Sequence, residues 1–252
     1  MQVDAIVLAG ARNDGKLLEI SSCEFEALIP INNRPMIQYV ISALQESTKI
    51  RDIVVVGHLA LKPYLQENIV LLECGKSMSE NIKIGIDYLE SKNHVLIITS
   101  DIPMITREAI DDFIDRCSEQ VGDLFYPVIT KEINDQAYPG VKRTYVKLKG
   151  GTYTGGNFVL MAPNVIDDCY MMIQRVVALR KKPVRISRML GFRFIIKLVL
   201  RRLTINEIEK RVEKMFGLQA LAVISFYPEI GTDIDKPSDW EIARRVLSIR
   251  AK

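Results

Sequence analysis

The sequence is poor in the residues that build zinc sites and disulfide scaffolds. Its 252 residues include four cysteines and two histidines. The cysteines lie far apart, with no C-x-x-C pair, and neither they nor the histidines have the spacing of a zinc site. A disulfide-dense small protein is therefore excluded, and we expect a reduced, cytoplasmic location.

Long apolar runs and a strong excess of one charge are also absent. No run approaches the ~18 residues that a membrane span needs, and MQVDAIVLAG lacks the basic segment of a signal peptide. The 34 basic and 31 acidic side chains give a net charge of +3, which offers no argument for nucleic acid as a partner. Hydrophobic residues make up 48%, an ordinary fraction for a globular protein.

The basic residues are nevertheless unevenly placed. The stretch 175–214 holds 13 basic and 3 acidic residues, net +10, which leaves net −7 elsewhere. Within it, 192–203 has apolar residues at helical spacing, with Arg193, Lys197 and Arg201 beside them. Two interpretations stay open: residues 186–203 contact an anionic membrane surface, or the helix packs its apolar face into the protein. Aromatic residues are too few here to indicate nucleic acid.

The first half of the chain alternates apolar runs with helical periodicity. Strands are predicted at 3–8, 52–57, 69–72, 94–99 and 123–130, and helices at 35–45, 79–90 and 106–117. Ser77 or Ser79 is expected to cap the second helix and Thr106 the third. This alternation predicts an α/β fold of three layers, with a mostly parallel sheet and helices on both of its faces.

The second half departs from this alternation. Strands are predicted at 145–148 and 157–161, on either side of the glycine-rich KGGTYTGGN, and residues 163–217 are mostly helical in pattern. A strand at 221–226 and a helix at 237–249 follow. We therefore predict a single domain, 1–252, with a helical insertion at about 164–217.

The loop after the first strand, LAGARNDGK, has the composition of a phosphate cradle. Glycine lets backbone N–H groups approach an anion, although the loop matches neither the dinucleotide fingerprint nor the P-loop. The alternative is a strand-to-helix turn in which Gly10 and Gly15 take positive φ.

Two acidic segments are candidates for a metal site. Asp101 follows the strand at 94–99, where open α/β sheets bind ligands, and a carboxylate there suits Mg²⁺. Its alternative role is to cap the following turn. Asp233 and Asp235 lie on an extended segment, and we expect only one of them to face a given metal. Helix-start chemistry explains Asp239 better than Asp235.

Five segments occur in the order found in nucleotidyltransferases: DAIVLAG, ALIPINNRPMIQYVISAL, TSDIPMIT, TGGNFVLMAP and DIDKPSDW. The chain thereby resembles the MobA-like NTP transferases, relatives of molybdenum-cofactor and sugar-phosphate nucleotidyltransferases, over residues 1–163 and 219–250. The resemblance implies a Rossmann-like nucleotide-binding fold of the nucleotide-diphospho-sugar transferase type. It also implies a Mg²⁺-dependent enzyme in which a phosphorylated small-molecule acceptor attacks the α-phosphate of an NTP and pyrophosphate leaves.

The resemblance also implies roles for particular residues. Asp101 and Asp235 would hold Mg²⁺ and act in catalysis with Lys16. The nucleotide-binding set is Leu8, Ala9, Gly10, Ala11, Arg12, Ser79 and Asn81. On the acceptor side we expect Gly155, Gly156 and Asn157, because glycines permit close approach to the backbone.

Three departures from the family pattern bear on activity. Ala11 replaces the second glycine of the loop, Gly15 its arginine, and Glu26 the lysine before the ALIPI segment. A carboxylate at that position would repel a triphosphate by ~1 kcal/mol or more. Either Lys16 or Arg34 replaces the lysine, or Glu26 binds metal or an acceptor hydroxyl, or activity is lost.

Two other functions stay open. The first is a non-catalytic module that binds a nucleotide or a partner, which Glu26 and Ala11 would favour. The second is a glycosyltransferase with a nucleotide-sugar donor, which normally uses a D-x-D motif. The single aspartate of Ser100-Asp101-Ile102-Pro103 argues against that motif.

Overall fold

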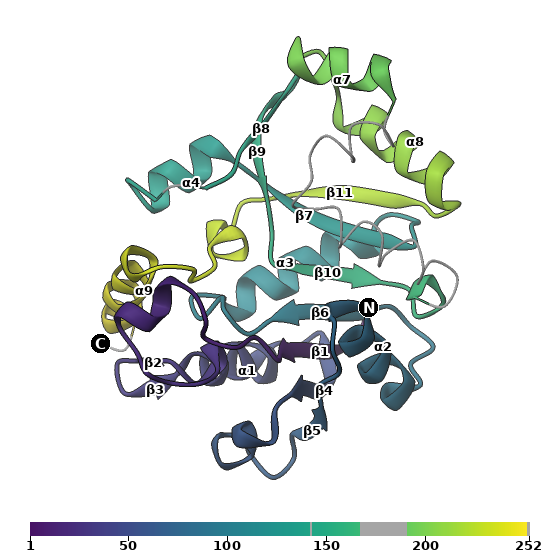
Figure 1. The fold of residues 1–252 in the computed structure, drawn as a ribbon. Coiled ribbons are helices and arrows are strands. Elements are labelled where there is room, and N and C mark those ends of the chain that lie inside the picture. The colour runs from purple at the N-terminus through teal and green to yellow at the C-terminus, as the bar shows by residue number, and fades with distance from the viewer. Residues whose placement is uncertain (142, 167–190, 251–252) are drawn as a thin grey trace.

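A mixed sheet of nine strands forms the centre of the structure, a computed structural model that describes residues 1–141, 143–166 and 191–250 (Figure 1). The strands are β1 (Val3–Ala9), β4 (Ile50–Gly57), β5 (Val70–Glu73), β6 (Val95–Thr99), β7 (Leu124–Thr130), β8 (Val146–Leu148), β9 (Gly151–Gly155), β10 (Phe158–Met161) and β11 (Ala220–Ser225). Their order is β5-β4-β1-β6-β10-β7-β9-β8, and β11 pairs with β7. Pairs β5–β4, β4–β1, β1–β6 and β7–β11 are parallel, whereas β10 and β9 run antiparallel to their neighbours.

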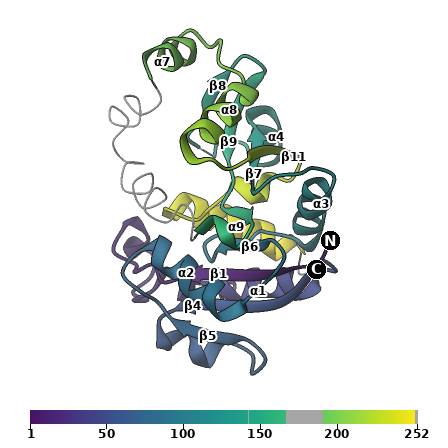
Figure 2. The same cartoon turned by 90° about the vertical axis from the view of Figure 1, so that its right-hand side faces the viewer.

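Helices cover both faces of this sheet, which confirms the predicted three-layer α/β class. The helices are α1 (Met36–Glu46), α2 (Met78–Leu89), α3 (Arg107–Ser118), α4 (Lys131–Ala137), α7 (Phe192–Val199), α8 (Ile205–Phe216) and α9 (Pro237–Arg250). The core under α1 and α3 is separate from the core under α2, and α8 packs against the latter. In Figure 2, α8 and α3 lie on either side of β7.

Alternation along β1 builds both cores at once. Val3, Ala5 and Val7 point into the α1–α3 core, while Ile6 between them points toward α2. This period of two is the geometry of a strand buried on both faces, which is why the sequence shows an unbroken apolar run. A third cluster joins the loop after β1 to α9 and includes Ile234.

The caps agree with the sequence patterns. Ser77 caps α2 by accepting a hydrogen bond from Glu80 N–H at 3.2 Å, and Thr106 caps α3 by accepting one from Ala109 N–H at 3.2 Å. Ser79, the other candidate cap, lies buried within α2.

The sequence patterns missed several elements, among them the short antiparallel pair of β2 (Pro30–Ile31) and β3 (Arg34–Pro35). The glycine-rich stretch between the predicted strands contains a strand of its own, β9, and a short helix, α4, follows β7 directly. Of the predicted helical insertion, α7 and α8 are helical, while 167–190 lies outside the described residues. No helix in the described ranges is both long and apolar enough to cross a membrane.

The close packing of α2 against β1 leaves little room for a side chain at Gly85. A Cβ at Gly85 would lie 2.8 Å from two side-chain carbons of Ile6. We expect Gly85→Ala to destabilise the protein by about 1–3 kcal/mol through overpacking, although alanine favours helix by ~1 kcal/mol over glycine. In an Ile6→Ala background the obstructing carbons are gone, so Gly85→Ala should become neutral or stabilising. Urea denaturation of the four variants measures this coupling, and an equal effect in both backgrounds would contradict it.

Candidate active site

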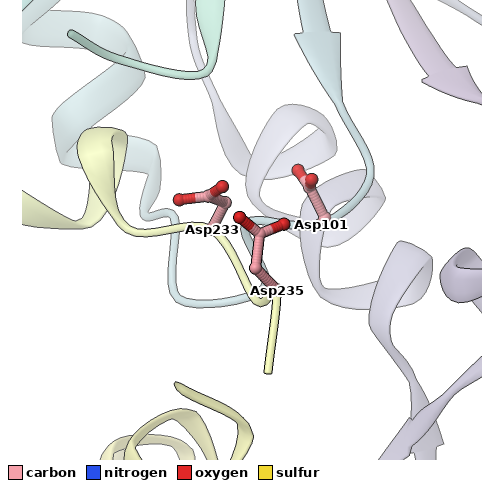
Figure 3. Close-up of side chains that lie close together, drawn as sticks. All are labelled: Asp101, Asp233 and Asp235. Carbon is pink, nitrogen blue, oxygen red and sulfur yellow. The ribbon is translucent and has the colours of Figure 1, made fainter. Parts of the chain in front are cut away.

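Three aspartates from two parts of the chain meet at the carboxyl end of β6. Asp101 follows β6, while Asp233 and Asp235 come from the segment between the 3-10 helix η4 (Pro228–Gly231) and α9. One carboxylate oxygen of each aspartate lies within 4.8 Å of the oxygens of the other two. Figure 3 shows the three carboxylates converging on one region. Such a group of oxygens is the ligand type that Mg²⁺ prefers.

One hydrogen bond to Asp101 joins the two segments, and a second one orients its carboxylate. The backbone N–H of Ile234 donates to the carbonyl oxygen of Asp101 at 2.9 Å, and the Thr99 hydroxyl donates to Asp101 Oδ1 at 2.5 Å. The Ile234 side chain is fully buried, so Asp233 and Asp235 on either side of it point the opposite way. The expectation that only one of these two aspartates faces the metal position is therefore wrong, because residues two apart on an extended chain share a face.

Arg143 holds Asp233 in place. Its Nη1 donates to Asp233 Oδ1 at 2.6 Å and its Nη2 to the Asp233 carbonyl oxygen at 2.8 Å. The Arg143 side chain is 8% exposed, and its buried Nε has no hydrogen-bond partner among the described residues. The guanidinium thus neutralises part of the acidic cluster.

Burial and mutual repulsion shift the carboxyl groups. Burial, and then the charge of Asp235, raise the pKa of Asp101, against the hydrogen bond from Thr99. Burial raises the pKa of Asp233 to about 7 despite the neighbouring Arg143. Burial and the charge of Asp101 raise the pKa of Glu26 to about 7 as well. The cluster therefore concentrates negative charge that a bound cation would relieve.

Two cavities open on either side of the aspartates. The first has a volume of about 600 Å³ and is lined by Lys16, Tyr126, Arg143, Thr144, Thr154, Gly155, Gly156, Asn157, Gly231, Asp233, Asp235, Lys236 and Asp239. The second has a volume of about 520 Å³ and is lined by Leu8, Gly10, Ala11, Glu26, Gly75, Lys76, Ser77, Met78, Asn81, Thr99, Ser100, Asp101, Asn157, Asp233 and Asp235. We call them the Arg143 cavity and the Gly10 cavity. They share Asn157, Asp233 and Asp235.

Asn157 lies at the junction because the strand register changes there. Gly155 pairs with Val128 of β7 and Leu160 pairs with Phe125, so two extra residues are accommodated between β9 and β10. The Asn157 N–H donates to the Ile230 carbonyl oxygen at 3.0 Å, and its own carbonyl accepts from the Thr99 N–H at 3.1 Å. The chain thus passes from β7 to β6 beside Asp101.

The predicted nucleotide-binding residues separate into two groups. Leu8, Gly10, Ala11 and Asn81 line the Gly10 cavity, where Asn81 Oδ1 accepts from the Gly75 N–H at 2.7 Å. The other three lie elsewhere: Ala9 is buried in β1, Arg12 pairs with Glu24 at 2.8 Å, and Ser79 is buried with its hydroxyl 3.2 Å from that of Ser77. Gly10 and Gly15 do not take positive φ, which among glycines of the described chain occurs at 140, 151, 191 and 217.

The predicted acceptor residues Gly155, Gly156 and Asn157 line the Arg143 cavity. Packing within the protein also accounts for the two glycines. A Cβ at Gly155 would lie 2.1 Å from the Tyr126 hydroxyl, and one at Gly156 2.6 Å from Ile230. Their lack of a side chain is therefore required by the protein itself, whatever the cavity binds.

Basic side chains that could bind phosphate line both cavities. Lys16 lines the Arg143 cavity, and Lys76, which sequence reasoning missed, lines the Gly10 cavity beside Glu26. Arg34, proposed as a substitute for the missing lysine, instead donates to the Gln38 carbonyl at 2.6 Å and stacks 4.6 Å from the Tyr39 ring centre. Arg34 therefore does not replace that lysine.

Other site residues had weak or absent signals. Asp233 could have been found from its spacing to Asp235, because two residues on an extended chain share a face. Arg143 lies in a loop that carries no motif, and only the fold brings it to the Arg143 cavity. Lys236 lies in the DIDKPSDW segment directly after Asp235, and this position could have indicated it.

Comparison with known proteins identifies the family. The family model of the MobA-like NTP transferase domain matches residues 5–189. A solved hypothetical transferase from Thermus thermophilus is 32% identical, with a TM-score of 0.85 over 95% of this chain and 100% of its own. Comparison with curated protein sequences found no match.

Two more distant structures share the fold. A CMP:2-keto-3-deoxy-manno-octonic acid synthetase complexed with CTP is 11% identical, with a TM-score of 0.66 over 99% of this chain and 100% of its own. A nucleotidyl transferase from Methanothermobacter thermautotrophicus is 12% identical, with a TM-score of 0.60 over 98% and 99%. From the matched family model and the 32% identity over almost the whole chain, we conclude that this protein is a nucleotidyltransferase of the MobA-like NTP transferase family.

Proposed function

We propose that the protein transfers a nucleotidyl group from an NTP in the Gly10 cavity to a phosphorylated small molecule in the Arg143 cavity, with Mg²⁺ bound between them. The observation that carries this proposal is that the two cavities share Asp233, Asp235 and Asn157. A transfer reaction needs the donor and acceptor substrates on opposite sides of one reacting centre. Two cavities that share carboxylates at their boundary provide that arrangement.

The Gly10 cavity fits the nucleotide. The loop after β1 and the segment before α2 line it with backbone, and the N-terminus of α2 adds a site that favours negative charge. Lys76 supplies a cation at the same wall. The solved relative bound to CTP is consistent with a nucleotide in this fold.

The Arg143 cavity fits a phosphorylated acceptor. Lys16, Arg143 and Lys236 bring three cations to its wall. Of these, Arg143 is paired with Asp233 and Lys236 with Asp239. The Tyr126 hydroxyl, which donates to the Gly156 carbonyl at 3.1 Å, adds a polar group. Arginine and lysine side chains are the usual protein partners of phosphate.

The chemistry follows from positioning and charge. An oxygen of the acceptor phosphate attacks the α-phosphorus of the NTP, the bond from that phosphorus to the β-phosphate bridging oxygen breaks, and pyrophosphate leaves. Asp101 and Asp235 would hold Mg²⁺, which supplies positive charge to the phosphoryl oxygens when bound. Arg143 keeps Asp233 in position, and Lys16 neutralises charge on the acceptor side.

Replacing Asp101 tests the metal role. Asp101→Asn should remove the Mg²⁺-dependent part of the thermal stabilisation by an NTP and lower pyrophosphate release about a hundredfold or more. Because it removes one of several repelling charges, the metal-free variant should be at least as stable as the wild type. Asp87→Asn, on the exposed face of α2 and paired with Lys83, is the control. Unchanged Mg²⁺ dependence in Asp101→Asn would remove this residue from the metal site.

The raised pKa values predict how stability depends on pH. The pKa values of Glu26 and Asp233 rise from 4.5 and 3.8 to about 7 in the folded protein. Between these values the folded state binds protons that the unfolded state has lost, so the stability from these groups is present below about pH 4 and is lost as pH rises through about 7. In EDTA, the Tm of the wild type should therefore fall from pH 5 to pH 8 more steeply than that of Glu26→Gln.

A matched variant makes this measurement specific. Glu67→Gln, at an exposed glutamate outside both cavities, should leave the pH dependence of Tm unchanged. Parallel curves for the wild type and Glu26→Gln would show that the Glu26 carboxyl gains no proton on folding.

One observation also favours a non-catalytic nucleotide-binding module. Glu26 lines the Gly10 cavity where relatives carry a lysine, and its charge repels that of Asp101. A module of this kind would bind an NTP without releasing pyrophosphate. Glu26→Lys separates the two functions. If the protein is an active enzyme, the wild type releases pyrophosphate at a measurable rate and the variant changes that rate. If the protein is a degenerate module, the wild type releases none and release appears only in the variant.

A further inference from the structure

The end of the molecule around α7 presents apolar and basic side chains together. We define the α7 tip as residues 146–149 of the β8–β9 hairpin and residues 194–202 of α7 and the following turn. Figure 1 shows α7 at the outer end of this hairpin, and the Lys149 N–H donates to the Leu203 carbonyl at 2.9 Å. The exposed apolar residues of the tip are Val146 (45%), Ile196 (40%), Val199 (74%) and Leu200 (56%).

The end of α7 explains why these side chains remain outside. The N–H groups of Arg201 and Arg202 donate to the carbonyls of Leu198 and Lys197, at 3.0 and 2.7 Å, and Arg201 has a φ of 56°. This is a Schellman motif, which reverses the chain. Leu203, after the reversal, is 1% exposed and anchors the turn in the protein. The preceding turn of helix, with Val199, is thereby held away from the core.

The charges around this apolar surface are mostly positive. Residues 191–203 contain four basic residues and no acidic residue. On the neighbouring hairpin Lys147 and Lys149 are exposed, and Lys149 lies with Lys197 and Arg202 around one shallow cavity. Glu207 of α8 pairs with Lys197, and the remaining basic side chains of the tip outnumber this one carboxylate. A second copy of this tip would be repelled, while an anionic surface would be attracted.

The apolar residues distinguish among anionic surfaces. Val199, Leu200 and Ile196 are aliphatic and offer no ring on which a nucleic acid base could stack. Aliphatic side chains bordered by arginine and lysine instead match the boundary between headgroups and acyl chains of a bilayer. The matched family model ends at residue 189, so residues 194–202 of the tip lie beyond it and need not serve the nucleotidyl transfer itself.

We propose that the α7 tip docks the protein reversibly on an anionic lipid bilayer. Ile196, Val199 and Leu200 enter the headgroup boundary, and Arg201 and Arg202 contact lipid phosphates. The helix lies on the surface and does not cross it. The resulting attachment is peripheral, with a strength set by the few apolar side chains that enter the bilayer and by the attraction of the basic residues to the anionic surface.

Vesicle co-sedimentation of the full-length protein tests the proposal. We expect binding to phosphatidylcholine vesicles that contain phosphatidylglycerol, weak binding to phosphatidylcholine alone, and a loss of binding as salt rises. Val199→Glu should abolish binding. Val121→Glu, at a valine that is 88% exposed before β7, should leave it unchanged. Equal binding to both vesicle types, or equal binding by both variants, would overturn the proposal.

The basic residues are tested by a second matched pair. Arg202→Glu should weaken binding to the anionic vesicles about fivefold or more, whereas Arg245→Glu, at an exposed arginine of α9, should not. Stabilisation by NTP and Mg²⁺ should be the same in all four variants, which separates failure of this proposal from failure of the nucleotidyl transfer. Co-sedimentation that Arg202→Glu and Val199→Glu leave intact would assign the binding to another surface.

Discussion

The repulsion among the carboxylates at the end of β6 is the constraint that the structure around it must satisfy. Asp101, Asp233 and Asp235 lie within a few ångströms of one another, and the partial burial of Asp101 and Asp233 removes much of the water that would screen them. Backbone contacts hold the arrangement, because the bond from Ile234 N–H to the Asp101 carbonyl does not depend on the protonation of any carboxyl group. Arg143 adds a buried guanidinium that offsets part of the charge.

The same contacts determine where ligands can bind. The segment that carries Asp233 and Asp235 separates the Gly10 cavity from the Arg143 cavity, and both cavities include the two carboxylates. Asn157 sits at the same boundary through bonds to Ile230 and Thr99. The two extra residues between β9 and β10 place Asn157 at this boundary. The aspartates are therefore open to one cavity on each side.

Much of the fold could be predicted from the sequence because its signals are local. The unbroken apolar run of β1 and the caps of Ser77 and Thr106 each depend on neighbouring residues. The strand β9 was missed because its glycines imitate a loop, although Gly155 owes its lack of a side chain to the nearby Tyr126 hydroxyl. Arg143 could not have been found, because its contact with Asp233 joins residues 90 positions apart.

The order of motifs indicated Asp101 and Asp235 as members of the acidic cluster. To add Asp233 to it, one had to see that residues two apart on an extended chain share a face. Arg12 and Ser79 matched by position along the sequence, yet their side chains are engaged with Glu24 and Ser77. Position in a motif predicts where the backbone passes, and the local hydrogen bonds decide where each side chain points.

The most direct test of the account is a crystal structure with a non-hydrolysable NTP analogue and Mn²⁺ in place of Mg²⁺, with the metal located by anomalous scattering. The account predicts an anomalous peak in contact with Asp101 and Asp235, with the triphosphate in the Gly10 cavity and the Arg143 cavity free of nucleotide. A metal peak away from these aspartates, or a nucleotide bound in the Arg143 cavity, would contradict it.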